Sequence, residues 1–184
     1  MNILHLTPTD LTQETVTDGM PWNIADTVRT IDRQSISTIQ PLKSIFITNY
    51  NQGKPRTTVS NKLILKNMAQ SISGTITGLV VHIESQRASR ILDVLVQLTY
   101  NGALIGDNKA ILDIISDPSG AKSIQTGSNS QDYGSETDLW GAELTANMIN
   151  DPSFGVVIQF SSHLLYPCSD IAYIDYVSII GYSE

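Results

Sequence analysis

The sequence predicts an all-β domain: a two-sheet antiparallel sandwich or jelly roll with a short helical turn and an extended N-terminal arm. Apolar and polar residues alternate from residue 43 onward, as they do in half-buried strands. Clusters of Gly, Pro, Asn and Asp interrupt this alternation at short intervals. No long amphipathic segment offers the helical crossovers of a parallel sheet, so about seven or eight strands are expected in two packed layers.

The chain is expected to divide into an arm or irregular lead-in at residues 1–40 and the sandwich at residues 41–184. In the lead-in, Thr7–Asp10 and Asp18–Pro21 are typical of turns, and the apolar residues are isolated. A chain of 184 residues suits one domain with an arm, and its 41% of apolar residues can supply a substantial core.

Charge and hydropathy argue against two classes of partner. The net charge is −7 and no Lys/Arg cluster is present, so binding to nucleic acid or to an anionic membrane is not expected. No apolar run is long enough to span a bilayer, and the first residues do not have the pattern of a secretory signal. Synthesis in the cytoplasm, without membrane insertion, is therefore expected.

The strands of the first half follow from alternation and turn signals. They are expected at residues 44–50, 62–66, 78–84, 92–100 and 103–106. In the third run, Leu79, Val81 and Ile83 share one face, and in the fourth run Asp93 lies on the polar face. Asn101–Gly102 predicts a tight hairpin turn between the last two strands, because both residues tolerate positive φ.

The second half begins with a polar segment and ends with two strong strands. Residues 116–137, rich in Gly, Ser, Asn and Gln, are expected to form a loop. Thr145 is expected to cap a single helical turn that Pro152 stops. Strands are then expected at residues 154–161 and 172–182.

The last of these strands is apolar on both faces. One face is expected to carry Ile174, Tyr176, Ile180 and Tyr182, and the other Val177 and Ile179. Such a strand is either central in the sandwich and covered twice, or covered on one face by a neighbouring subunit.

Several segments of the second half occur in a distinctive order. They are Ile72–Glu84 (ISGTITGLVVHIE), Asn101–Ala110 (NGALIGDNKA), Tyr133–Gly141 (YGSETDLWG), Asn150–Val156 (NDPSFGV) and Ala172–Val177 (AYIDYV). In this order and spacing they resemble a β-sandwich, jelly-roll-like domain that recurs in virion and tail proteins of tailed bacteriophages. The resemblance covers roughly residues 57–182. Trp140 beside Gly141 is expected to be an aromatic plug that closes the sandwich.

This resemblance implies a non-enzymatic structural role in a phage particle. The chain would be a capsid decoration or cement protein, or an accessory protein of a fibre, tail or baseplate. It would be made in the host cytoplasm and carried in the virion. Its expected partners are other capsid or tail proteins and copies of itself in a closed homo-oligomer, for example a trimer. The N-terminal arm would thread onto a neighbour.

Catalytic, metal and cofactor motifs are not expected. His5, His82 and His163 fall in the arm, on the polar face of a strand and in a loop, without ligand-like spacing. Cys168, the only cysteine, is expected to be a small buried hydrophobe. No nucleophile-elbow, P-loop or dinucleotide-binding glycine pattern occurs.

One acidic cluster was considered for hydrolysis or calcium binding. Asp132, Glu136 and Asp138 are close together in the polar segment. Glycoside hydrolysis needs two carboxylates opposed across a cleft, whereas a solvated turn places no such demand. The solvated turn is the favoured interpretation.

Five aromatic residues leave a second function open. Trp22, Tyr50, Tyr133, Tyr166 and Tyr173 could form a platform that stacks on sugars, or could belong to the core or to a subunit interface. The interface interpretation is favoured because the last strand is apolar on both faces. The alternative is a carbohydrate-binding adhesin that contacts glycans of the host cell surface through loops at one end of the sandwich.

Overall fold

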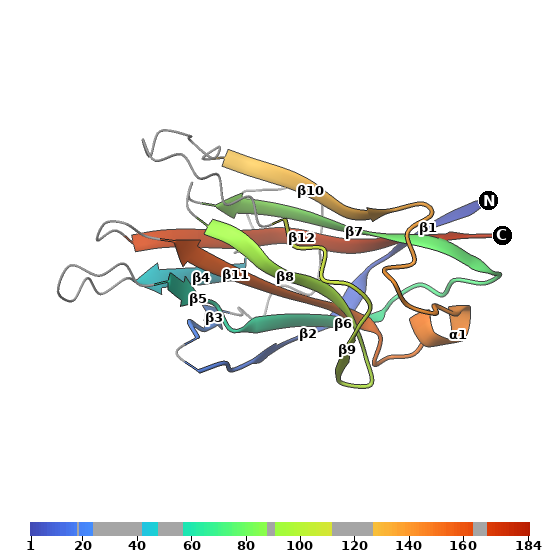
Figure 1. Ribbon diagram of the computed structural model, residues 1–184, viewed down its shortest axis with the longest axis horizontal. Helices are drawn as coiled ribbons and strands as arrows, with labels where there is room; N and C mark the ends of the chain where they lie inside the picture. The colour runs from blue at the N-terminus through green and yellow to red at the C-terminus, as the bar shows by residue number, and fades with distance from the viewer. Residues whose placement is uncertain (18, 24–41, 48–56, 88–90, 112–126, 164–168) are drawn as a thin grey trace.

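A computed structural model describes residues 1–17, 19–23, 42–47, 57–87, 91–111, 127–163 and 169–184. Within these residues the strands form two antiparallel sheets packed face to face, which confirms the predicted sandwich (Figure 1). Sheet A contains, in spatial order, β10 (Gly127–Ser135), β7 (Ile76–Arg87), β12 (Ser169–Ser183), β4 (Leu42–Ile47) and β3 (Trp22–Asn23), with β1 (Asn2–Leu6) also paired to β12. Sheet B contains β2 (Pro8–Glu14), β6 (Lys62–Met68), β11 (Gly155–His163), β8 (Ile91–Tyr100) and β9 (Ala103–Ile105), with β5 (Thr57–Val59) also paired to β11.

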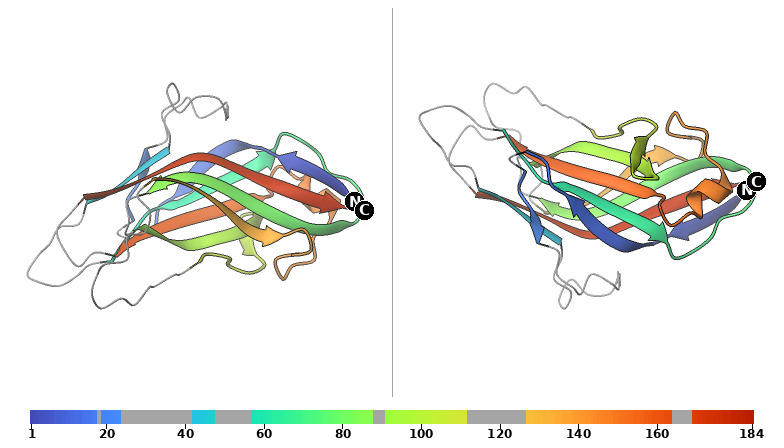
Figure 2. Two further views of the ribbon diagram at one scale, coloured as in Figure 1. Left: turned by 90° about the horizontal axis from the view of Figure 1, so that it is seen from above. Right: turned by 90° about the horizontal axis from the view of Figure 1, so that it is seen from below.

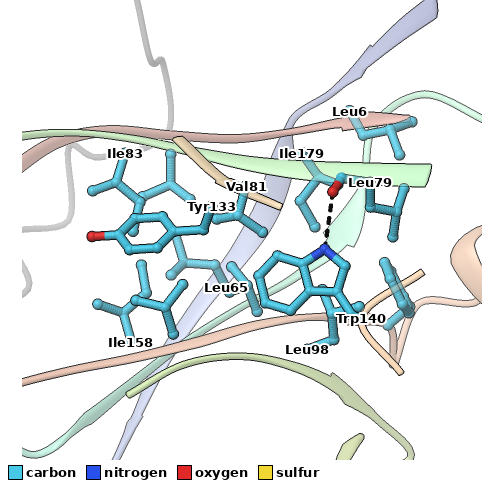
Figure 3. Packing of buried hydrophobic residues seen from close by; sticks show 14 of the residues in the cluster. Leu6, Leu65, Leu79, Val81, Ile83, Leu98, Tyr133, Trp140, Ile158 and Ile179 are labelled. Carbon is cyan, nitrogen blue, oxygen red and sulfur yellow. Dashed lines mark hydrogen bonds between the residues drawn. The ribbon is translucent and has the colours of Figure 1, made fainter. Parts of the chain in front are cut away.

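The core lies between the two sheets, where alternate side chains of each strand meet. From sheet A, Leu79, Val81 and Ile83 of β7 are fully buried, as the alternation predicts. From sheet B, β11 contributes Ile158 and Phe160, which are equally buried. Figure 3 shows Val81 and Ile83 across the core from Ile158. Removing this apolar surface from water is the main force that holds the two layers together.

The N-terminal segment is part of the sandwich, and the arm predicted for residues 1–40 is wrong for residues 2–14. β1 pairs with β12 in sheet A, and β2 pairs with β6 in sheet B. Leu6 at the end of β1 is fully buried in the core. Asn2 lies opposite Ser183, so both termini lie at the same end of the sandwich (Figure 2). Trp22 and Asn23 also join sheet A as β3, and residues 18 and 24–40 of the predicted arm lie outside the described residues.

Two irregular pairings invert the alternation that the sequence predicts. In β8, Leu95 lies opposite Gln159 but Asp93 lies opposite Phe160, so the strand has one extra residue at this point. Asp93 therefore faces the core rather than the predicted polar face, and it is buried. A similar shift at residue 175 of β12 turns Ile174 into the core.

After the shift in β12, the apolar residues of the strand divide differently from the prediction. Ile174 is buried in the core with Val177 and Ile179, whereas Tyr176 stays on the outer face of sheet A. β12 is central, paired with β7 on one side and with β1 and β4 on the other. The strand is therefore central in sheet A, but its outer face is only half-buried, so it is not fully covered on both faces by the described residues.

A nine-residue strand occupies part of the segment that was predicted to be a loop. Gly127–Ser135 forms β10 at the edge of sheet A and pairs with β7 along its whole length. Among the side chains of this strand that the structure describes, Tyr133 is the one that belongs to the core. An edge strand with one solvated face needs little apolar sequence, which is why its composition is typical of loops.

The turns predicted at Asn101–Gly102 and after Thr145 are confirmed, whereas the turn predicted at Thr7–Asp10 is wrong because Pro8–Glu14 forms β2. Asn101 and Gly102 have φ of 51° and 77° in the turn between β8 and β9, which is the positive-φ pair that a tight hairpin needs. Thr145 caps the single helical turn α1 (Ala146–Ile149): its hydroxyl accepts a hydrogen bond from the N–H of Met148 at 3.2 Å. Among the described residues, no helix is long and apolar enough to cross a membrane.

Trp140 closes the core, as predicted. Its side chain is fully buried, and its indole N–H donates a hydrogen bond of 2.9 Å to the carbonyl of Leu79 (Figure 3). Gly134 lies beside this contact, with a φ of 92°, and a Cβ there would collide with the Leu79 carbonyl and the indole nitrogen. The ring can therefore reach β7 only because the adjacent edge strand carries a glycine at this position.

Candidate functional site

Of the aromatic residues singled out as a platform or interface, Trp22 is a core residue. It is 2% exposed, and its indole N–H donates a hydrogen bond to the carbonyl of Asn61 at 2.8 Å. Its ring meets Phe160 edge to face, with the centroids 5.5 Å apart. Trp22 is therefore not available to stack on a sugar, and the core alternative applies to it.

Tyr133 is buried as well, at 2% exposed. Its hydroxyl donates a hydrogen bond of 2.5 Å to the carboxylate of Asp93, which links β10 of sheet A to β8 of sheet B. The core alternative therefore applies to Tyr133 too. Tyr50 and Tyr166 lie outside the described residues, as does the side chain of Tyr173.

The acidic residues considered for hydrolysis or calcium binding have separate partners. Asp132 pairs with His82, and Asp138 pairs with Lys109. Glu136 is exposed. Within the residues that the structure describes, no group of three or more His, Cys, Asp or Glu side chains is arranged to hold a metal ion. The geometry thus joins Asp132 and Asp138 to His82 and Lys109 rather than to each other.

Asp138 and Lys109 form an ion pair beside Trp140. Their charged atoms are 2.9 Å apart, and the ammonium also lies 5.9 Å from the centre of the Trp140 ring. Burial raises the pKa of Asp138, but the hydrogen bonds from Lys109 and from the N–H of Trp140, with the charge of Lys109, outweigh it and hold the pKa below its ordinary 3.8. The hydrogen bond to Asp138 raises the pKa of Lys109 above 10.5 despite partial burial. This pair anchors the segment that carries the aromatic plug.

The three histidines do not meet in one site. His5 is exposed on β1, His82 lies on the outer face of β7 as predicted, and His163 is the last residue of β11 rather than part of a loop. Of the three, His82 has two carboxylates beside its ring. Its Nδ1 is 2.5 Å from Asp132 and its Nε2 is 3.3 Å from Glu84. The imidazole can donate to both carboxylates only when it carries both ring protons.

The outer face of sheet A, which points away from sheet B, carries the clearest candidate for an interaction surface. Its apolar residues, called here the outer stripe, are Ile3, Val80, Tyr176, Ile180 and Tyr182. In register, Ile180 lies between Val80 of β7 and His5 of β1, and Tyr182 lies opposite Ile3. Ile3 is 56% exposed, and the three side chains from β12 are half-buried.

The outer stripe and His82 form one continuous surface. His82 lies opposite Ser178 of β12, one step along the sheet from the pair of Val80 and Ile180. The ring of His82 meets that of Tyr176 edge to face, with the centroids 6.0 Å apart. The surface is therefore apolar toward the chain termini and polar toward Asp132. Such an arrangement can bury apolar area against a partner while its polar margin forms hydrogen bonds.

The sequence predicts this surface only in part. The last strand is predicted to be apolar on both faces, but Ile3 falls in the predicted arm, and its place beside Tyr182 depends on pairing between the two ends of the chain. The alternation of residues 4–6 is the local signal. It is too short to distinguish a strand from an irregular lead-in.

The fold and this surface define the chain as a two-sheet antiparallel sandwich with an apolar stripe on the outer face of one sheet. No family model matches the chain, and no curated protein or solved structure is significantly similar to it. The resemblance to the virion and tail domain of tailed bacteriophages remains a prediction from the sequence motifs.

Proposed function

We propose that this protein is a non-enzymatic structural subunit of a tailed-phage particle, and that it holds neighbouring subunits through the outer face of sheet A. The role could be that of a capsid decoration or cement protein, or of an accessory protein in a fibre, tail or baseplate. In each case the chain acts by burying surface against other virion proteins rather than by turning over a substrate.

The observation that carries the proposal is that β12 is apolar on both faces. Val177 and Ile179 bury one face in the core. On the other face, Ile180 and Tyr182 are only half-buried, and Ile3 beside them is largely exposed. Large apolar side chains gathered on the face of a sheet mark an interaction surface more often than isolated exposed ones do. Burying this apolar surface against a neighbour stabilises the contact by about 25 cal/mol per Å². Each copy of the subunit in the particle contributes such a contact.

The charged groups of the described residues also support a structural role. Asp138 is engaged by Lys109 beside the aromatic plug, Asp132 by His82, and Asp93 by the hydroxyl of Tyr133. Each of these contacts ties one segment of the sandwich to another. A hydrolytic pair would instead need two carboxylates that share an open cleft.

The test compares one substitution on each sheet. Ile3→Glu places a charge on the outer stripe at a side chain that is 56% exposed, and Leu104→Glu does the same on β9 of sheet B, where the side chain is 42% exposed. Each variant is supplied in trans while the encoding phage grows, and its incorporation into purified particles is measured. Ile3→Glu should lower incorporation about tenfold or more, since an unpaired charge would have to be desolvated at the contact.

Leu104→Glu is the control and should leave incorporation close to that of the unmodified chain. Both variants should keep their unfolding midpoint, because both side chains are exposed. Equal incorporation of the two variants would refute the role of the outer stripe. Loss of binding to host glycans by Ile3→Glu, with incorporation unchanged, would instead favour the carbohydrate-binding adhesin.

A further inference from the structure

The edge strands of the two sheets differ in whether their outward backbone N–H and C=O groups are blocked. β10 is the long edge strand whose outward groups are open. β10 pairs with β7 on one side. On its other side, no strand pairs with it within the part of the chain that the structure describes. It is nine residues long and contains neither proline nor lysine, two residues with which proteins commonly block an edge.

The facing edge of sheet B is blocked. Beyond the short pairing with β9, the exposed edge of β8 is covered by the segment that follows β9. The amide of Asn108 accepts a hydrogen bond from the N–H of Val96 and donates one to the carbonyl of Val94. The N–H of Lys109 donates to the carbonyl of Val96 at 2.9 Å. A strand from another molecule would find these positions of β8 already occupied.

The remaining described edges are short or charged. β2 begins at Pro8, which has no N–H to offer, and carries Asp10 and Glu14 on its exposed positions. β1, β3, β5 and β9 have five, two, three and three residues. β10 carries one charged residue, Asp132, which is paired with His82, and it is the one long described edge with neither proline nor lysine.

The hydrogen-bond pattern shows which backbone groups of β10 face outward. Leu79 of β7 directs its N–H to the carbonyl of Asp138 and its carbonyl to the indole of Trp140, both on the side where β10 lies. Alternate residues of β7 then direct their groups to β10, which leaves the N–H and C=O of the even-numbered residues 128–134 on the free edge. In agreement, the carbonyl of Asp132 accepts a hydrogen bond from the side chain of Gln131, on the same strand.

We propose that the free edge of β10 pairs with β10 of a second copy of this chain, antiparallel and about a two-fold axis. The register that pairs Gly127 with Ser135 of the second copy uses the whole strand and places Gln131 on the axis. Ser130 then lies opposite Asp132, where a hydroxyl can donate to a carboxylate. Shifting the register by two residues in one direction would set Asp132 against its own copy, and like charges directly opposite are unfavourable.

This pairing would join two sheets A into one continuous sheet. It uses the edge of sheet A rather than its outer face, so it goes beyond the proposed function and leaves the outer stripe of both copies free for other subunits. A two-fold contact of this kind stops at a dimer, because the outward backbone groups of each β10 edge are hydrogen-bonded by the other copy. The second copy fits better than an unrelated strand because the strand complements itself in its longest register.

Disulfide trapping tests the register. Because Cys168 is the only cysteine, the parent for this test is the full chain with Cys168→Ser. Gln131→Cys would place two cysteines in a non-hydrogen-bonded pair on the axis, with Cα atoms about 4.5 Å apart, which is within the range of a disulfide. Ser135→Cys is the matched control, since the two copies of residue 135 would be about 27 Å apart at about 3.4 Å per residue. Under mild oxidation, Gln131→Cys should give a covalent dimer and Ser135→Cys should not.

Sedimentation of the native chain, which keeps Cys168 and has no added cysteine, tests whether the dimer forms. The native chain should show a concentration-dependent dimer, and Ser130→Pro should raise its dissociation constant about tenfold or more, because it removes an outward N–H that the contact needs. The circular dichroism spectrum and unfolding midpoint of Ser130→Pro monitor its fold. Ile3→Glu should leave this dimer unchanged, so the failure of either proposal can be told from that of the other.

Two results would overturn the pairing. One is a chain that stays monomeric at every concentration, with no cross-link from Gln131→Cys, as expected if a strand from a different protein takes this edge or none does. The other is an equal yield of cross-linked dimer from Gln131→Cys and Ser135→Cys, which would mean that the contact has no defined register.

Discussion

The outer face of sheet B has opposite charges facing each other along its β2 edge, whereas the outer face of sheet A carries the outer stripe. In sheet B, Lys62 of β6 lies opposite Glu14 of β2, with 3.0 Å between their charged atoms. Four residues further along β6, Lys66 lies opposite Asp10. Between these two pairs, and on β11, the same face holds Ile64 and Val157, which lie opposite each other. In sheet A, the outer face of the central strand β12 holds Tyr176, Ile180 and Tyr182.

The proposed function places a partner on the outer face of sheet A and solvent on the charged edge of sheet B. Opposite charges on neighbouring strands keep a sheet face hydrated and discourage association. An apolar stripe has the opposite effect, and the core between the two sheets is closed without it. The substitutions below compare the two faces.

The largest effect is expected from Leu6→Ala, which tests whether β1 is part of the fold. Leu6 is fully buried, so its truncation should lower the free energy of unfolding by about 2–5 kcal/mol. The control on the same strand is Ile3→Ala, which faces outward and should change stability by no more than about 0.5 kcal/mol. Chemical denaturation of both variants gives the comparison. Equal effects would mean that β1 does not bury its inner face.

A smaller effect is expected from the link between the two sheets. Tyr133→Phe removes the hydroxyl that hydrogen-bonds to the buried carboxylate of Asp93, and should destabilise the protein by about 1–3 kcal/mol. Tyr182→Phe is the matched change on the outer stripe and should cost little. Urea midpoints at constant m-value provide the measurement. If the two variants are equally stable, the Tyr133 hydroxyl contributes nothing to holding the sheets together.

A smaller and pH-dependent effect is expected from the ion pair beside the plug. The pKa of Asp138 is below 3.8 in the fold, so its contribution is present above pH 3.8 and is lost as pH falls through the lower, folded-state pKa. The pKa of Lys109 is above 10.5, so its contribution is present below pH 10.5 and is lost as pH rises through the raised pKa. Asp138→Asn should cost about 0.2–1 kcal/mol between these limits.

The control for the ion pair is Glu136→Gln, which removes an exposed carboxylate from the same segment. The stability difference between Asp138→Asn and the native chain should narrow in acid, whereas Glu136→Gln should follow the native chain at every pH. A difference that is as large in acid as at neutral pH would show that the ion pair is not its source.

The smallest effect is expected on the outer face of sheet B. Lys62→Ala removes an exposed ion pair with Glu14, and should change stability by a few tenths of a kcal/mol, less still in high salt. Incorporation into particles should be unaffected. Impaired incorporation would show that sheet B also contacts a partner, and the contrast between the two faces would no longer hold.

Local signals in the sequence predicted much of the fold. The alternation of Leu79, Val81 and Ile83 identified a strand and its inner face, because two-residue periodicity needs no knowledge of the partner strand. The turn at Asn101–Gly102 and the cap at Thr145 were predictable for the same reason. Each depends on the conformational preferences or hydrogen bonds of neighbouring residues.

Features that depend on distant partners could not be predicted. The strand Gly127–Ser135 has the composition of a loop and becomes a strand through its pairing with β7. Asp93 reaches the core through one extra residue in β8, and a slip of one residue reverses every face. Trp22 and Tyr133 could not be assigned, since an amphipathic ring is buried when a polar partner for its N–H or O–H lies inside the core.

The pairing of β1 with β12 has a consequence for how the chain folds during synthesis. The first strand leaves the ribosome long before the strand that receives it, since Asn2 pairs with Ser183. Until then Leu6 has no neighbour from β12 to cover it, and sheet A lacks its central strand. Closure of so long a loop, together with strand pairings that are mostly distant in sequence, favours slow folding that waits for β12 rather than stepwise folding strand by strand.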